Sequence, residues 1–369
     1  MTSPLPPVLV AYNLPRVRER TAKGRGLQAA TYRGLGASIG LCGESDAGVL
    51  KELAAVTKAL KRLGVQCRSA GAHTLEDLRA VLATASEPVV FNLVEDLQGP
   101  DDRAAAVPSI CRAFGKGCSG SDSRCLWLST DKWLSKGVLA ACGVPSPQAV
   151  LVTPGGAIPQ KLPPFPLIVK PAGCDASEGI GPASVVDSPG PRLRDVVKQV
   201  HRRFGQPAMV EQFIEGREIN VSLLQRGQRV EVLPLVEIDF SAFGPDKLRI
   251  IHYRAKWVTE SFEYRNTPRI IPAPFHDQQA ERIREMALAA WRAMGCMDYA
   301  RVDFRLDAGG NPFVLEVNAN PDISPEAGFS AALQGGGVKY EDFVGTVISN
   351  AASRLEPTPA AYASALGGA

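Results

Sequence analysis

Oxygen-bearing side chains gather on one side of a predicted β-hairpin near the C-terminal end of the sequence. The segments ARVDFRL and PFVLEVN alternate apolar and polar residues with a period of two, and the turn-forming sequence DAGGN separates them. With the turn centred on its two glycines, Asp303 faces Glu316 and Arg301 faces Asn318. Two opposed carboxylates repel each other unless one carries a proton or a cation lies between them.

A divalent cation would relieve this repulsion. Asp303, Glu316 and the amide oxygen of Asn318 are hard oxygen ligands of the kind that Mg²⁺ prefers, and such a site is completed by water and substrate phosphates. The alternative is a solvated charged face on an edge hairpin, and a register shift of one residue would disperse the cluster. The same register predicts an apolar opposite face made of Val302, Phe304, Leu306, Phe313, Leu315 and Val317.

A magnesium site of this type requires a nucleotide, and the sequence lacks both the P-loop and a dinucleotide-binding fingerprint. Instead, PLIVKPAGCDASEGIG places Lys170 at the end of a predicted buried strand, followed by a small-residue loop that contains Ser177. Backbone N–H groups of such a loop can bind phosphate while the lysine supplies a point charge. An ordinary strand-end lysine with a flexible loop is the alternative interpretation.

Two further segments carry candidate functional groups. MVEQFIEGREINVSLL is predicted to form a hairpin, with Glu211 and Glu218 on either side of the turn EGR. IHYRAKWVTESFEYRNTPRI is predicted to be a long loop or irregular strand that contains Arg254, Lys256 and Trp257. Considered alone, these charged side chains would most often be solvated surface residues.

The order of predicted elements sets the fold class. The first 127 residues alternate strands such as VLVAY and PVVFNLVED with amphipathic helices, which is typical of an α/β domain with a buried parallel sheet. From Thr130 onward the pattern is α+β, and it includes a helix from Asp277 to Met294 that Gly295 ends. We expect domains at 1–127 (with a basic loop insertion at 16–40), 128–207 and 208–354, and a disordered tail at 355–369.

Composition excludes several classes of protein. The net charge of +3 gives no sign of a nucleic-acid partner, and the sequence shows neither an apolar run long enough to span a membrane nor a recognisable export signal. Eight scattered cysteines form no CxxC motif, and four histidines supply no metal-ligand spacing. These features predict a cytoplasmic protein with reduced thiols and no membrane association.

Six short motifs occur in an order that resembles one superfamily: TDK, VKP with a small-residue loop, VEQFIEGRE, YRAKW, ARVDF and LEVNANP. In this order they are similar to the ATP-grasp superfamily, and within it to the D-alanine:D-alanine ligase branch. FNLVEDLQG and SGSD fit the same branch, so the resemblance runs from about residue 85 to residue 350. It implies an ATP-grasp fold with an N-terminal Rossmann-like domain, a central lid and a C-terminal catalytic domain. Dimers are common in this branch, so a homodimer is expected by analogy.

The resemblance also implies roles for individual residues. Lys132 and Lys170 would bind the ATP phosphates under a flap that contains Ser177, and Lys256 would reach the γ-phosphate. The remaining ATP contacts would come from Glu211 and the backbone of Ile214 at the adenine and from Glu218 at the ribose. Asp303, Glu316 and Asn318 would hold two Mg²⁺ ions, and Arg301 would stabilise negative charge on an acyl phosphate and on the tetrahedral intermediate.

The reaction implied by the resemblance joins two small molecules. A carboxylate substrate attacks the γ-phosphate of ATP, and an amine substrate then attacks the acyl phosphate, giving an amide, ADP and phosphate. We expect amino-acid-like substrates in a specialised biosynthetic pathway. The alternatives are an authentic cell-wall D-alanine:D-alanine ligase, a nucleotide-binding regulator without turnover, and a kinase that leaves its phosphate on a stable acceptor.

The sequence departs from the branch where the amine substrate would bind. Ligases of the branch have a glycine after the NxxP proline and a Ser-Leu pair a few residues on, whereas this sequence has Asp322, Ala327 and Gly328. An acid there would repel a substrate carboxylate and favour an ammonium group, so the amine is not expected to be D-alanine. Asp46 (beside Ser45) and Glu95 are further candidates for substrate contacts. The basic segment from Arg16 to Arg33 is extra, either a solvated insertion or a contact for an anionic substrate.

Overall fold

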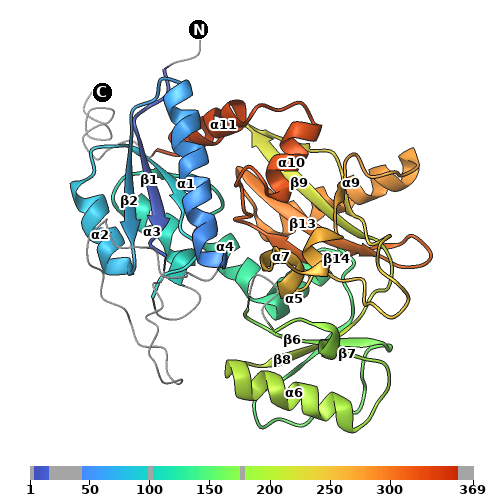
Figure 1. The fold of residues 1–369 in the computed structure, drawn as a ribbon. Coiled ribbons are helices and arrows are strands. Elements are labelled where there is room, and N and C mark those ends of the chain that lie inside the picture. Colours follow the sequence, from blue (N-terminus) through green and yellow to red (C-terminus); the bar gives the residue numbers. More distant parts are fainter. Residues whose placement is uncertain (1–3, 16–43, 99–102, 175–178, 356–369) are drawn as a thin grey trace, which may run out of the picture.

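The computed structural model describes residues 4–15, 44–98, 103–174 and 179–355, and it contains three β-sheets (Figure 1). The predicted basic segment 16–40, Ser177 and the tail from residue 356 lie outside these ranges. None of the helices in the described ranges is long and apolar enough to cross a membrane. As expected from the sequence, the described residues form a mixed assembly of helices and sheets.

The N-terminal sheet is parallel with strand order β2-β1-β3-β4. Its central strands are buried except at Tyr12, which is half-buried, and this burial explains their largely apolar sequence. Helices α1 and α11 cover one face, while α2 and α3 cover the other. The elements are β1 (Val8–Asn13), α1 (Glu44–Arg62), β2 (Cys67–Ala72), α2 (Leu75–Thr84), β3 (Val89–Leu93), a 3₁₀ turn (Arg103–Ala106), α3 (Val107–Ala113) and β4 (Gly117–Cys118).

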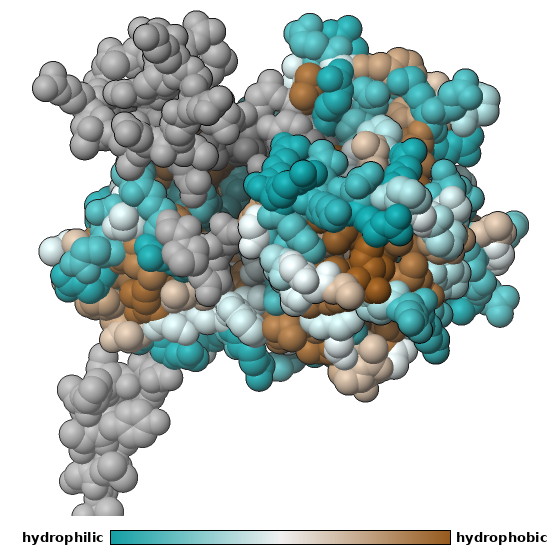
Figure 2. Space-filling view, turned by 90° about the horizontal axis from the view of Figure 1, so that it is seen from below, coloured by the Kyte–Doolittle hydropathy of each residue, from teal (hydrophilic) through white to brown (hydrophobic). Residues whose placement is uncertain are grey.

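Two helices lead to a smaller middle sheet of order β5-β8-β6-β7, whose one face packs on α6. The elements are α4 (Ser123–Thr130), α5 (Lys132–Ala141), β5 (Ala149–Val152), β6 (Leu167–Pro171), a 3₁₀ turn (Pro182–Ser184), β7 (Val185–Val186), α6 (Pro191–Phe204) and β8 (Ala208–Gln212). Figure 2 looks onto this end of the molecule, where hydrophilic surface predominates and hydrophobic residues show in smaller areas.

The large sheet has six strands in the order β12-β11-β9-β13-β14, with β10 paired to β9. One face packs on α9 and α5, and α10 and α11 lie against the other. The elements are β9 (Glu218–Arg226), β10 (Arg229–Val232), β11 (Val236–Ile238), α7 (Tyr253–Trp257), α8 (Phe262–Arg265), β12 (Arg269–Ile270), α9 (Asp277–Met294), β13 (Tyr299–Leu306), β14 (Pro312–Asn318), α10 (Gly328–Gly335) and α11 (Tyr340–Ser353).

The hairpin predicted for MVEQFIEGREINVSLL is wrong. Strand β8 pairs with β5 and β6 in the middle sheet, whereas β9 pairs with β10, β11 and β13 in the large sheet. The segment 213–217 is therefore a linker between two sheets. Gly216 has a φ of 140°, and a Cβ there would lie 2.0 Å from the carbonyl oxygen of Leu306, so only glycine fits. The loop predicted around YRAKW is also wrong, because the short helices α7 and α8 form there.

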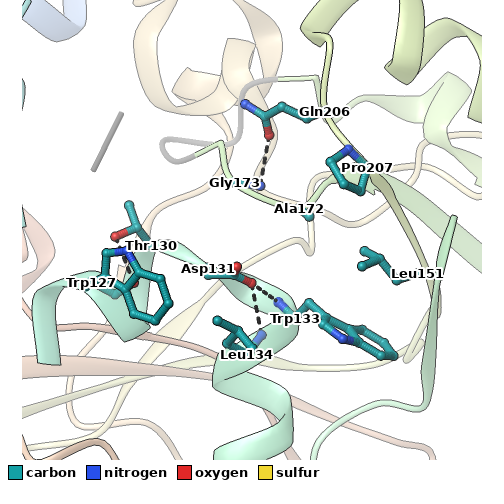
Figure 3. A pocket seen from close by; sticks show the side chains of 10 residues that line it. All are labelled: Trp127, Thr130, Asp131, Trp133, Leu134, Leu151, Ala172, Gly173, Gln206 and Pro207. Carbon is teal, nitrogen blue, oxygen red and sulfur yellow. Dashed lines mark hydrogen bonds between the residues drawn. The ribbon is translucent and has the colours of Figure 1, made fainter. Parts of the chain in front are cut away.

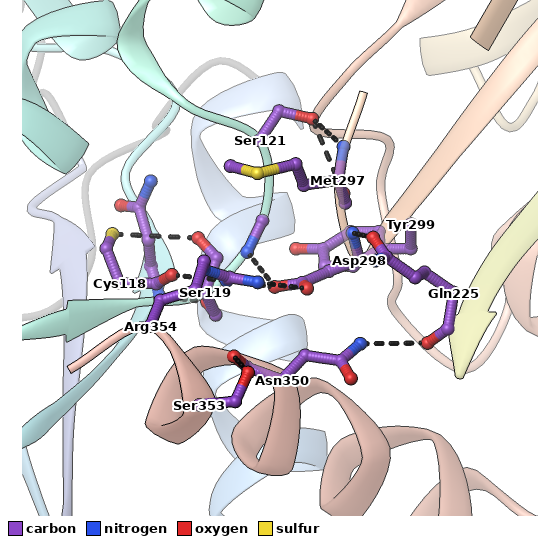
Figure 4. A network of polar contacts seen from close by, with 12 residues as sticks. Cys118, Ser119, Ser121, Gln225, Met297, Asp298, Tyr299, Asn350, Ser353 and Arg354 are labelled. Atoms are coloured by element: carbon purple, nitrogen blue, oxygen red, sulfur yellow. Dashed lines mark hydrogen bonds and ion pairs between the residues drawn. The ribbon is translucent and has the colours of Figure 1, made fainter. Parts of the chain in front are cut away.

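A buried polar network ties the N-terminal sheet to the large sheet (Figure 4). Asp298, at the start of β13, is fully buried and accepts two hydrogen bonds from the Arg354 guanidinium, at 2.8 and 2.7 Å. Its Oδ2 also accepts from the backbone N–H of Gly120, at 2.7 Å. Arg354 in turn donates to the carbonyl oxygen of Cys118 at 2.7 Å. These contacts fix the SGSD segment against the strand that carries Arg301 and Asp303.

Candidate active site

The hairpin of β13 and β14 has the predicted register at its functional end. Arg301 pairs with Asn318, and Asp303 pairs with Glu316. A β-bulge then shifts the register by one residue, so that Phe304 pairs with Val314. The predicted apolar face is therefore wrong at two positions: Val314 is completely buried, whereas Phe313 and Leu315 are only half-buried.

The Asp303 carboxylate accepts hydrogen bonds from three neighbouring side chains. Arg301 donates from Nε at 2.7 Å and from Nη2 at 2.8 Å, one bond to each carboxylate oxygen. Asn220 of β9 donates to Oδ1 at 2.7 Å, and Asn318 donates to Oδ2 at 3.0 Å. Burial lowers the pKa of Arg301, but the adjacent Asp303 more than offsets it and leaves this pKa raised. Asn220 was not predicted from the sequence. It lies opposite Asp303 because β9 pairs with β13.

The amide of Asn318 lies between the two opposed carboxylates. Its Nδ2 is 3.0 Å from Asp303 Oδ2 and 3.4 Å from Glu316 Oε1. A half-turn of this amide would present its oxygen to the same space, giving three oxygen donors on one face of the hairpin. That donor set fits Mg²⁺. Because no three His, Cys, Asp or Glu side chains cluster suitably anywhere in the described ranges, such a site depends on Asn318 as its third ligand.

Four cationic side chains lie close enough to Glu316 to favour its ionised form. Burial disfavours ionisation of its carboxyl, but Lys132, Lys256, Lys170 and Arg301 outweigh that effect and lower its pKa to about 2. These cations come from α5, α7, β6 and β13, so four separate elements converge here. Their combined positive charge makes the site suitable for a polyphosphate.

The first of these lysines is held between α5 and the end of the middle sheet. Asp131 caps α5 by accepting from the backbone N–H groups of Trp133 and Leu134, both at 2.9 Å. The backbone N–H of Lys132 donates to the Ala172 carbonyl at 3.1 Å, and its ammonium donates to the carbonyl of Cys174. Lys132 therefore lies beside the start of the small-residue loop, as the motif order predicts.

Glu211 lies between two lysines in the interior. Its carboxylate oxygens are 2.8 Å from Lys170 Nζ and 2.7 Å from Lys136 Nζ, and all three residues are at most 7% exposed. Burial opposes ionisation of Glu211, but the two ammonium groups outweigh it and lower its pKa. Lys136 also donates to the Pro147 carbonyl at 2.9 Å. Sequence analysis missed Lys136, although it lies one helical turn after Lys132 on the same face of α5.

Glu218, at the start of β9, is paired with Arg305, a residue that sequence analysis also missed. Arg305 donates to Glu218 Oε2 at 3.2 Å, to the Arg249 carbonyl at 2.7 Å and to the Gly216 carbonyl at 3.2 Å. Its guanidinium carbon lies 5.2 Å from the centre of the Phe213 ring. Burial raises the pKa of Glu218, and Arg305 opposes that rise. Arg305 thus joins the inter-sheet linker to the segment that leads into α7.

Two cavities lie against elements that are close in sequence to the candidate residues. One, of about 690 Å³, lies between the inter-sheet linker, the middle sheet and the segment before α7, and Phe213, Gly216 and Arg305 line it. The other, of about 440 Å³, is shown in Figure 3 between α4, α5 and the middle sheet. There Gln206 Oε1 accepts from the backbone N–H of Gly173 at 2.9 Å and holds the start of the small-residue loop.

The structure describes only some of the side chains that were predicted to contact substrates. Asp322 is half-buried after β14, and its Oδ1 accepts from the Ser324 backbone N–H at 2.8 Å. Glu95 is exposed after β3. Asp46 lies in the first turn of α1, but its side chain falls outside the described part of the structure, as does Ser177 entirely. Ile214 is buried in the inter-sheet linker, and Lys256 is half-buried in α7.

Comparisons with known proteins place the chain in a family. The model of the D-ala D-ala ligase C-terminus matches residues 157–349. An uncharacterised protein of Sinorhizobium fredii, y4sG, is 35% identical over 72% of this chain and 75% of its own length. The D-alanine–D-alanine ligase of Ralstonia pickettii is 27% identical over 79% of this chain and 84% of its own.

Solved structures confirm the ATP-grasp fold that was expected from the sequence. The D-alanine–D-alanine ligase of Bacillus anthracis, in its complex with ATP, superposes with a TM-score of 0.68 at 17% identity, covering 94% of this chain and 98% of that one. At this low identity the structural match shows the fold alone, whereas the family model and the relatives match the chain in sequence. The chain belongs to the D-Ala–D-Ala ligase C-terminal domain family and is an ATP-dependent, ADP-forming carboxylate-amine ligase that uses ATP and Mg²⁺.

Proposed function

We propose that this ligase joins a carboxylate substrate to an amine substrate that is not D-alanine, with both substrates amino-acid-like and part of a specialised biosynthetic pathway. One observation carries the proposed site: Lys132, Lys170, Lys256 and Arg301 converge on Glu316, beside Asp303 and Asn318. Such a cluster of cations next to oxygen donors suits the transfer of a phosphoryl group, in which positioning and charge stabilisation supply most of the catalysis.

In this proposal the three lysines bind the phosphates of ATP. The resemblance implies an adenine contact for Glu211. We propose instead that Glu211 positions Lys170 and Lys136, because its carboxylate already binds both ammonium groups. Asp303, Glu316 and Asn318 would hold the Mg²⁺ ions, which offset phosphate charge when bound. Ser177 would contact the phosphates from the flap.

Arg301 lies where negative charge develops. Its guanidinium is held in a fixed orientation by two hydrogen bonds to Asp303, so it can stabilise the acyl phosphate and the tetrahedral intermediate with little reorganisation. The substrate carboxylate attacks the γ-phosphorus and releases ADP. The amine nitrogen then attacks the acyl carbon, loses a proton and expels phosphate, which leaves the amide.

The nucleotide would lie along the inter-sheet linker, next to the 690 Å³ cavity that Phe213, Gly216 and Arg305 line. The backbone of Ile214 would contact the adenine and Glu218 the ribose. The contacts of Arg305 support this placement, since it fixes both Glu218 and the linker at Gly216. We therefore propose Arg305 as a positioning residue of the nucleotide site.

Arg305→Met should raise the KM for ATP by about tenfold or more, because it leaves the Glu218 carboxylate buried without its charged partner. The kcat at saturating ATP should fall less. Steady-state kinetics with varied ATP measure both, and Arg282→Met on the exposed face of α9 is the matched control. An unchanged KM in Arg305→Met would contradict the proposed role.

Asp322→Gly should change the preference among amine substrates by about tenfold or more while ATP affinity stays the same, because a carboxylate next to the amine site selects ammonium-bearing substrates. Competition between amines, read by mass spectrometry of the amides, measures this preference. An unchanged amine profile combined with weaker ATP binding would count against a substrate role for Asp322.

The alternative within the family is an authentic D-alanine–D-alanine ligase, the name carried by the relative from Ralstonia pickettii. Asp322 and Ala327 argue against it, since they stand where that branch has a glycine and a serine. Formation of a D-alanyl-D-alanine product with D-alanine alone would favour this alternative over our proposal.

The first half-reaction can be tested without knowing the amine. Hydroxylamine traps an acyl phosphate as a hydroxamate, so a set of carboxylates incubated with ATP, Mg²⁺ and hydroxylamine should give a hydroxamate with the true substrate. A phosphorylated product that resists hydroxylamine would indicate a kinase. Tight ATP binding without ADP release for any carboxylate would indicate a regulator.

Three broader features belong to the same proposal. We propose a cytoplasmic homodimer without membrane or nucleic-acid partners. We also propose that the catalytic domain ends near residue 354 and that the N-terminal domain ends near residue 127. The lid should extend to Gln212 instead of residue 207, because β8 is part of the middle sheet.

A further inference from the structure

A buried glutamate joins the N-terminal helix to the segment that carries Asp322. Glu52, on α1, is 3% exposed, and its Oε1 accepts from the backbone N–H of Ile323 at 2.7 Å. The carbonyl of Ile323 is held as well, by the hydroxyl groups of Ser330 at 2.9 Å and Tyr340 at 3.0 Å. The backbone that follows Asp322 is thus fixed on both sides.

The groups that face Glu52 include two acids, which would repel its negative charge, and two tyrosines, whose hydroxyls stay neutral. They are Asp322 from the segment after β14, Glu95 from the end of β3, Tyr299 from β13 and Tyr340 from α11. Across the described ranges, Glu52 forms no ion pair with a lysine, arginine or histidine. The pKa of Glu52 is raised from 4.5 to about 10, mainly by burial and then by the negative charges of Glu95 and Asp322.

We propose that Glu52 is a positioning residue that carries a proton at neutral pH and donates it in a hydrogen bond to the Asp322 carboxylate. The inference rests on the proposed role of Asp322 in amine selection. The Glu52 side chain lies within hydrogen-bond reach of Asp322, and its Oε1 accepts from the Ile323 backbone N–H at 2.7 Å. The Asp322 carboxylate also accepts from the Ser324 backbone N–H at 2.8 Å, so it is held from two sides.

This arrangement gives the site one fixed negative charge in place of two mobile ones. A carboxylate oriented from two sides can direct a substrate ammonium toward one position, whereas two unprotonated carboxylates would repel each other and open the segment. Glu52 acts only through Asp322 and Ile323, so its loss should affect amine binding more than ATP binding.

Two variants separate a protonated Glu52 from an ionised one. Glutamine has the shape of the protonated acid and can both donate to Asp322 and accept from Ile323. Glu52→Gln should therefore keep the KM for the amine within about threefold of the wild type, whereas Glu52→Ala should raise it about tenfold or more. The KM for ATP should change little in either variant. Glu52→Gln as impaired as Glu52→Ala would overturn the proposal.

The pH dependence gives a second kinetic readout. Wild-type activity should decline on the alkaline side as Glu52 loses its proton, and this decline should be absent or weaker in Glu52→Gln. Identical pH profiles for the two proteins between pH 7 and pH 10 would contradict a proton held at Glu52.

Thermal unfolding tests the proton without any substrate, so its outcome does not depend on the proposed function. The pKa of Glu52 is about 10 in the folded protein and 4.5 in the unfolded one, so between these pH values the folded protein binds more protons than the unfolded protein. The contribution of Glu52 to stability therefore falls as pH rises from about 4.5 toward about 10. The Tm of Glu52→Gln relative to wild type should therefore increase between pH 5 and pH 9. A constant difference, as expected for the exposed control Glu281→Gln, would overturn the proposal.

Discussion

Glu316→Gln is expected to reduce turnover by at least about a hundredfold to a thousandfold, the loss typical for removal of one group that stabilises transition-state charge. The substitution removes the negative charge on which Lys132, Lys170, Lys256 and Arg301 converge. It also removes one of the two carboxylates that would hold Mg²⁺. ADP release measured against Mg²⁺ concentration gives the size of the loss and any change in apparent metal affinity.

The fold of this variant should persist, because the buried face of the hairpin is untouched: Val302, Val314 and Val317 remain in the core. Circular dichroism and Tm check this point. Glu281→Gln, on the exposed surface of α9, is the matched control and should turn over normally. Turnover close to wild type in Glu316→Gln would exclude the proposed metal site.

Glu211→Ala should have the largest effect on stability, about 3–5 kcal/mol, because breaking a buried ion pair leaves uncompensated charge inside the protein. Here two ammonium groups, those of Lys136 and Lys170, would lose the carboxylate that they share at distances of 2.7 and 2.8 Å. Urea unfolding followed by fluorescence measures the free energy of unfolding for each protein.

Two controls accompany Glu211→Ala: the same substitution at an exposed glutamate, and a double variant that also removes one of the two buried lysines. Glu281→Ala removes an exposed partner of Arg284 and should change stability by no more than about 1 kcal/mol. Adding Lys136→Met to Glu211→Ala should recover part of the loss, since one buried charge is then gone. A cost below about 1 kcal/mol for Glu211→Ala would mean that water or another anion compensates the lysines.

The part of the site formed by one local hairpin could be predicted from the sequence. Alternation with period two and the DAGGN turn together define the register that places Asp303 opposite Glu316. The β-bulge beyond this pair could not be predicted, because it inserts one residue without changing the apolar pattern. That single residue is why Val314, and not Phe313 or Leu315, is completely buried.

Contacts between distant segments account for what sequence reasoning missed. Segments on either side of EGR have strand-like patterns, yet they enter different sheets because their pairing partners lie far away in the chain. Local patterns likewise do not reveal that Lys136 meets Glu211, that Arg305 meets Glu218 or that Glu52 meets Ile323. In each case a buried charged or polar residue is the only local signal, and its partner is set by the tertiary fold.

The central claim is that ATP cleavage is coupled to formation of an amide. The most direct measurement incubates the enzyme with ATP and Mg²⁺ across a grid of paired D- and L-amino acids and other metabolic amines, and determines ADP, phosphate and product mass in each well. We predict wells in which two different compounds are both required and in which ADP, phosphate and amide form in equal amounts. Phosphate transfer to a stable acceptor without an amide, or ADP release independent of any amine, would contradict the account.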